Sequence, residues 1–81
     1  MKLPRDISGK ELARLLGRYE YHVTNQTGSH MRLTSTIKRT EHHVTIPTHK
    51  FLKVGTLSSI LNEVASYLEL DRDTLVAKLF R

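Results

Sequence analysis

A histidine and an arginine lie two residues apart in the segment Gly28-Ser29-His30-Met31-Arg32. The alternation of polar and apolar residues predicts a β-strand here, on which His30 and Arg32 share one face about 7 Å apart. An imidazole that titrates near neutral pH can take a proton from a ribose 2′-hydroxyl or give one to a leaving 5′-oxygen. The guanidinium of Arg32 would stabilise the charge that develops on the phosphate. The spacing is therefore compatible with RNA cleavage. It is equally compatible with a surface histidine at a strand edge that has no chemical role.

Further basic or titratable side chains follow in residues 47–55. This stretch is predicted to be a loop, because Pro47 has no N–H to donate and ends the pairing of a strand. A loop with two lysines and a histidine suits phosphate groups, and a merely solvated loop is an equally good interpretation. The candidate RNA-binding residues are Gly28, Ser29, Arg32, His49, Lys50 and Lys53.

The remaining histidines give a weaker indication of a metal site. His42 and His43 are neighbours, so they point to opposite faces of a strand and cannot both bind one metal ion without distortion. His22, His30 and His43 could converge on one sheet face and bind a transition metal if the register of the strands allowed it. No carboxylate falls in that set and no spacing matches a known metal motif. We therefore expect no metal ion and no other cofactor.

The composition limits the classes of protein to consider. The 81 residues have room for one compact domain, which we expect to span residues 1–81. Thirteen lysines and arginines against eight acidic residues give a net charge of +5, which favours a polyanionic partner. No apolar run approaches the roughly 20 residues that cross a bilayer, and no secretory signal is visible, so we expect a cytoplasmic protein. The lack of cysteine excludes disulfides, thiolate zinc sites and cysteine nucleophiles.

Helical periodicity occurs in both the N-terminal and the C-terminal parts of the chain. Ser8 and Glu11 have the spacing of a capping box, which begins a predicted helix over residues 9–18. Thr56 is the expected N-cap of a second helix, and Asp71 is that of a short third helix. The apolar faces of the first two helices, expected in the core, contain Leu12, Leu15, Leu16, Tyr19, Leu57, Ile60, Leu61, Val64 and Leu68.

Between the helices the periodicity changes to two. Three alternating runs, residues 21–26, 29–37 and 41–46, predict strands that short links join into an antiparallel meander. Val23 and Ile37 are expected to point into the core. The order of helix, three strands, helix and helix predicts an α+β domain whose sheet is covered on one face. The open face would carry His22, Thr24, Gln26, His30, Arg32, Thr34, Thr36, His43 and Thr45.

Four segments together resemble a known family. Residues 10–16, followed in order by QTGSHMRL, HHVTIPTHK and KVGTLSSIL, are similar to the HicA toxins of bacterial and archaeal toxin–antitoxin pairs. The resemblance covers nearly the whole chain, and its specific parts are Gly-Ser-His and Val-Thr-Ile-Pro-x-His. Residues 71–81 extend beyond the point where many members end, and this tail either packs on the core or contacts the antitoxin.

The resemblance implies a fold and an activity. The implied fold is double-stranded-RNA-binding-like, and the implied activity is cleavage of mRNA without a metal ion or a small-molecule cofactor. The implied partner is a HicB-type antitoxin, with no membrane involved. The catalytic histidine of the family falls on His30 and its glycine on Gly28. A second histidine of the family, after the third strand, falls on His49.

Two other functions stay open at the level of sequence. A non-catalytic RNA-binding module of the same fold is typically marked by lysines and arginines at a helix N-terminus. Residues 55–59 lack such a cluster, although Lys50 and Lys53 precede them. Surface aromatic residues for base stacking are also expected to be lacking, because Phe51 and Tyr67 are isolated. A DNA-binding regulator would need a helix-turn-helix pattern, and none is visible.

Overall fold

The computed structural model describes residues 2–81, and residue 1 lies outside the described part. The order of elements is helix, three strands, helix and helix, which confirms the predicted α+β class; the double-stranded-RNA-binding-like label stays a prediction. No helix within residues 2–81 is long and apolar enough to cross a membrane. The elements are α1 (Gly9–Leu16), the short 3₁₀ helix η1 (Gly17–Tyr19), β1 (His22–Thr27), β2 (His30–Ser35), β3 (His42–Pro47), α2 (Val54–Leu68) and α3 (Arg72–Phe80).

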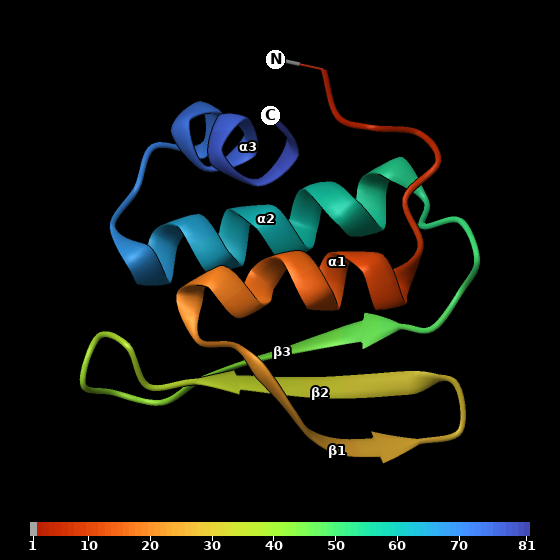
Figure 1. Ribbon diagram of the computed structural model, residues 1–81, viewed down its shortest axis with the longest axis horizontal. Coiled ribbons are helices and arrows are strands. Elements are labelled where there is room, and N and C mark those ends of the chain that lie inside the picture. The colour runs from red at the N-terminus through yellow and green to blue at the C-terminus, as the bar shows by residue number, and fades with distance from the viewer. Residues whose placement is uncertain (1) are drawn as a thin grey trace.

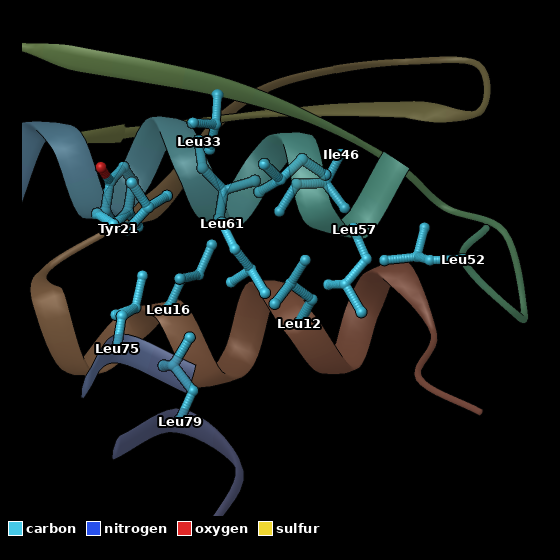
Figure 2. Packing of buried hydrophobic residues seen from close by; sticks show 14 of the residues in the cluster. Leu12, Leu16, Tyr21, Leu33, Ile46, Leu52, Leu57, Leu61, Leu75 and Leu79 are labelled. Carbon is cyan, nitrogen blue, oxygen red and sulfur yellow. The ribbon is translucent and has the colours of Figure 1, made fainter. Parts of the chain in front are cut away.

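The helices lie on one side of an antiparallel sheet with the strand order β1-β2-β3. Figure 1 shows α1 and α2 side by side next to the sheet, and α3 on the side of these helices that is away from the strands. The core lies between these layers. Figure 2 shows Leu33 and Ile46 of the sheet pointing toward Leu57 and Leu61 of α2. Within residues 2–81 no helix lies on the other face of the sheet, as the alternation in the sequence predicts.

Two of the predicted helix caps are confirmed and one is wrong. The side chains of Ser8 and Asp71 each accept a hydrogen bond from the backbone N–H three residues later, at 3.0 and 3.2 Å. Thr56 is not an N-cap, because α2 begins at Val54 and is preceded by Lys53. The first N–H groups of a helix have no partner within the helix, so Val54 and Gly55 are tolerated in the first turn of α2. The start of this helix is therefore weakly marked in the sequence.

The N-terminus of α1 packs directly on the chain that leaves β3. The N–H of Gly9 donates to the carbonyl of His49 at 3.0 Å, and a Cβ on Gly9 would lie 1.8 Å from the carbonyl oxygen of Pro47. Just before α1, the carbonyl of Ile7 accepts a hydrogen bond from the N–H of Leu52 at 2.9 Å. These contacts hold the loop after β3 in place.

A β-bulge in β1 makes one prediction for the open face wrong. The register shifts between Val23 and Asn25, so Thr24 is an extra residue in the strand. One extra residue reverses the alternation of side chains beyond it. Gln26 therefore pairs with Met31 on the helix-covered side of the sheet, and Asn25 occupies the open face in its place.

Two apolar residues that were expected in the core are at the surface. Val23 is 48% exposed and lies on β1, an edge strand whose residues are all exposed. Ile37 is 38% exposed because β2 already ends at Ser35, which leaves Ile37 in the connection to β3. The hydroxyl of Ser35 is buried and donates to the carbonyl of Tyr19 at 2.7 Å, so this end of β2 is bonded to η1.

The C-terminal tail packs on the core. Leu75, Val76 and Leu79 of α3 are buried. A guanidinium N–H of Arg18 donates to the carbonyl of Lys78, which joins the end of α3 to η1. Of the two roles left open for residues 71–81, the structure therefore shows the packing role.

Candidate functional site

The turn between β1 and β2 places His30 at the surface. Gly28 and Ser29 connect the two strands, and Gly28 has a φ of +54°, which glycine adopts without the steric cost of a Cβ. His30 is consequently the first residue of β2, between Thr27 on β1 and Pro47 on β3. Its side chain is exposed. A phosphate in solvent can reach an imidazole in this position.

Arg32 lies on the same face of the sheet as His30. Both side chains are exposed and alternate with buried residues of β2, which confirms the shared face expected from the sequence. The register places Arg32 between Asn25 on β1 and Thr45 on β3. The guanidinium thus has polar side chains on both neighbouring strands of the open face. It lies two residues along β2 from the imidazole of His30.

The loop after β3 lies beside the β1–β2 turn. The N–H of Thr48 donates to the carbonyl of Ser29 at 2.7 Å, so the two segments are bonded to each other. The loop exposes His49 and Lys50, and it exposes Lys53 directly before α2. Figure 1 shows the turn, this loop and the first residues of α1 and α2 at one end of the molecule. The structure therefore gathers the candidate RNA-binding residues at this end, with Arg32 further along β2.

The other two histidines of the open face are separated from each other by Thr34. His22 on β1 and His43 on β3 both pair with Thr34 of β2. The Nδ1 atom of His43 is 2.8 Å from the hydroxyl of Thr34, and its Nε2 atom is 3.4 Å from the carboxylate of Glu41. His43 is therefore held by its neighbours four residues along β2 from His30. Within residues 2–81, no group of three or more histidine or acidic side chains is arranged to hold a metal ion.

An aromatic cluster at the other end of β3 was not expected from the sequence. The hydroxyl of Tyr21 is 2.7 Å from Nδ1 of His42, and the ring of Tyr67 stacks on His42 with 4.7 Å between the centroids. Tyr67, expected to be isolated, also hydrogen-bonds through its hydroxyl to the backbone at the end of β2 and in the connection to β3. A hollow of about 420 Å³ beside the cluster is lined by His42, Asn62, Glu63, Ser66 and Tyr67.

Burial determines the protonation of this cluster. It lowers the pKa of His42 below its ordinary value of 6.5; the carboxylate of Glu63 opposes this shift and His43 adds to it. Burial also raises the pKa of Tyr21 well above its ordinary value, with smaller contributions from Tyr67 and Glu63. Both groups are consequently neutral at neutral pH, and one neutral group can donate its hydrogen to the other. The cluster is a packed and hydrogen-bonded part of the domain.

The region that contains the turn and the loop matches a known family. The family described as the HicA toxin of bacterial toxin-antitoxin systems matches residues 9–65, which run from the start of α1 through most of α2. Neither a curated protein nor a solved structure gives a significant match. The matched region covers well over half of the 81 residues and includes β1, β2, β3 and both connecting segments at the candidate site. The chain therefore belongs to the HicA family of toxins from bacterial toxin–antitoxin pairs.

Proposed function

We propose that this toxin cleaves RNA and that His30 is its catalytic acid–base group. The observation that carries the proposal is the position of His30, exposed at the start of β2 next to a turn that is bonded to a basic loop. Arg32 on the same face supplies a positive charge for the phosphate. Membership of the toxin family supports the proposal, and so does the net charge of +5, which favours a polyanionic partner.

The proposed reaction is an attack of the ribose 2′-oxygen on the adjacent phosphorus. The bond from the 2′-oxygen to phosphorus forms and the bond to the 5′-oxygen breaks, which leaves a 2′,3′-cyclic phosphate and a 5′-hydroxyl. One proton leaves the 2′-hydroxyl and another is gained by the 5′-oxygen. The imidazole of His30 serves one of these transfers, and water or a second group serves the other. Arg32 stabilises the charge on the phosphate in the transition state.

We further propose mRNA as the substrate and a HicB-type antitoxin as the partner. Gly28, Ser29, His49, Lys50 and Lys53 would contact the backbone of the RNA, because they surround His30 or lie on the loop bonded to its turn. The open face of the sheet carries exposed polar side chains and is free of helices. We therefore expect the antitoxin to cover this face together with His30.

The test uses purified protein and a labelled single-stranded RNA with excess chelator. His22→Ala is the matched control for His30→Ala, because His22 is also an exposed histidine on the open face. We expect wild type and H22A to produce 2′,3′-cyclic phosphate ends. His30→Ala should cleave about 100- to 10,000-fold more slowly, with an unchanged circular dichroism spectrum and most of its RNA affinity.

Three results would overturn parts of this proposal. Equal cleavage by His30→Ala would remove the catalytic role of His30. Loss of the folded spectrum in this variant would make His30 structural. If wild type binds the RNA and does not cleave it, the chain is better described as a non-catalytic RNA-binding module.

A further inference from the structure

Contrary to the expectation that surface aromatic residues are lacking, Phe51 is exposed on the loop that lies next to the candidate site. At 57%, it has the largest exposed fraction among the large apolar side chains of residues 2–81. It belongs to residues 48–53, which we call the Phe51 loop. Covering an exposed aromatic ring removes apolar surface from water and lowers the free energy, so a partner can gain affinity by contacting this ring.

The backbone holds Phe51 outward. On one side, the N–H of Thr48 is bonded to the carbonyl of Ser29. On the other side, Leu52 is buried at the end of the core (Figure 2), and its N–H is bonded to the carbonyl of Ile7. Because the loop is anchored at both ends, the ring of Phe51 is presented on a fixed support.

The chain on both sides of Phe51 is positively charged. Residues 42–62 contain no aspartate or glutamate, and Lys50, Lys53 and His49 are close to Phe51 along the chain. The Nζ atom of Lys50 is 5.8 Å from the centroid of the Phe51 ring, within the range of a cation–π contact. Lysine is depleted at protein–protein interfaces. An aromatic ring between cations is typical of surfaces that bind single-stranded nucleic acid by base stacking.

The Phe51 loop is within reach of an RNA bound at His30. Pro47 pairs directly with His30, and Phe51 follows four residues later. The chain from Pro47 to Phe51 spans at most ~14 Å, and the backbone of Pro47 lies ~5 Å from that of His30. The backbones of His30 and Phe51 are therefore within about 20 Å of each other. A few nucleotides of single-stranded RNA can bridge this distance.

We propose that Phe51 stacks on a base of single-stranded RNA a few nucleotides from the bond cleaved at His30. Lys50 and Lys53 then contact the neighbouring phosphates. This inference rests on the proposed function, since it uses RNA as the ligand and His30 as the point of cleavage. Stacking is possible with every base. Phe51 therefore adds affinity for RNA and little preference for sequence.

Tryptophan fluorescence gives a direct test of stacking. The chain contains no tryptophan, so Phe51→Trp introduces a single fluorophore at the proposed contact. Ile37→Trp is the matched control, because Ile37 is an exposed apolar residue beyond the opposite end of β2 from His30. Both are made with His30→Ala and titrated with a single-stranded RNA oligonucleotide of mixed sequence. We expect saturable quenching in F51W and none in I37W; equal responses would overturn the proposal.

Affinity measurements separate stacking from simple burial of an apolar group. Phe51→Leu keeps an apolar side chain and removes the aromatic ring. It should weaken RNA binding about 5- to 100-fold, while Phe51→Trp binds RNA as tightly as the wild type does. If F51L binds RNA as wild type and binds the antitoxin more weakly, Phe51 is a protein-docking residue and the proposal is wrong.

The outcomes also distinguish this inference from the proposed function. Quenching of F51W together with no cleavage by the wild type would keep the stacking surface and refute the catalytic proposal. Cleavage that depends on His30, together with no quenching of F51W and no loss of affinity in F51L, would refute only the stacking surface.

Discussion

Replacing Gly9 by alanine would test how closely α1 packs on the end of β3. The added Cβ would lie 1.8 Å from the carbonyl oxygen of Pro47 and 2.9 Å from its carbonyl carbon. Both atoms belong to the backbone of a paired strand, so they cannot turn away as a flexible side chain can. We expect α1 to be pushed outward and the hydrogen bond from the N–H of Gly9 to the carbonyl of His49 to weaken.

The size of this effect follows from three contributions to the free energy of unfolding. Overpacking at a closely packed site costs about 1–3 kcal/mol, and weakening the backbone hydrogen bond adds about 0.5–1.5 kcal/mol. Alanine offsets up to about 1 kcal/mol, because it reduces the conformational freedom of the unfolded chain. The net loss is about 0.5–4.5 kcal/mol, and each kcal/mol lowers the Tm of a domain of this size by roughly 4–8 °C.

Thermal and urea unfolding, followed by circular dichroism, measure this loss. Gly17→Ala is the matched control, because a Cβ on Gly17 would have no atom within 4 Å and its φ of −57° suits alanine. We expect G17A to be as stable as wild type or slightly more stable. If G9A and G17A unfold at the same temperature, the close contact between α1 and β3 does not exist in solution.

Three further predictions concern other parts of the molecule. Tyr67→Phe removes the hydroxyl that binds the backbone at the end of β2 and in the connection to β3. It should lower the free energy of unfolding by about 1–3 kcal/mol in urea titrations, and an unchanged midpoint would mean that water replaces these bonds. Burial lowers the pKa of His42 in the folded state, so the unfolded chain binds a proton at His42 more readily than the folded chain does. The contribution of neutral His42 to the free energy of unfolding is therefore complete above about pH 6.5 and decreases below it. In His42→Gln, the free energy of unfolding should not show this decrease below about pH 6.5. Parallel curves of stability against pH for the wild type and the variant would contradict the prediction. Arg32→Ala should reduce the slope of the logarithm of RNA affinity against the logarithm of salt concentration by about 1, whereas an equal slope would exclude a phosphate contact.

Local patterns in the sequence were enough to predict the features that neighbouring residues determine. Ser8 and Asp71 are followed by backbone N–H groups that they can cap, so these helix starts were predictable. In β2 the buried residue Met31 lies between His30 and Arg32, which marks the strand register and puts the two candidate site residues on one face. These predictions needed no knowledge of distant contacts.

Features that depend on distant contacts were not predictable in this way. Beyond Val23, the residues of β1 are all polar, so no apolar residue marks the bulge that moves Gln26 to the other face. Tyr67 meets His42 from a helix 25 residues further along the chain. Phe51 has no aromatic neighbour in the sequence, and the position of its loop depends on backbone hydrogen bonds from Thr48 and Leu52 to distant segments.

The bulge at Thr24 also affects how two copies of the chain can meet. β1 is an edge strand of the sheet, and the backbone groups on the outer side of an edge strand can pair with a strand of another molecule. A bulge bends and twists the strand and interrupts the regular spacing of its donors and acceptors. A second copy of β1 therefore cannot pair along its whole length. The shift that carries Gln26 to the other face thus also protects the β1 edge of the sheet against pairing with a second copy.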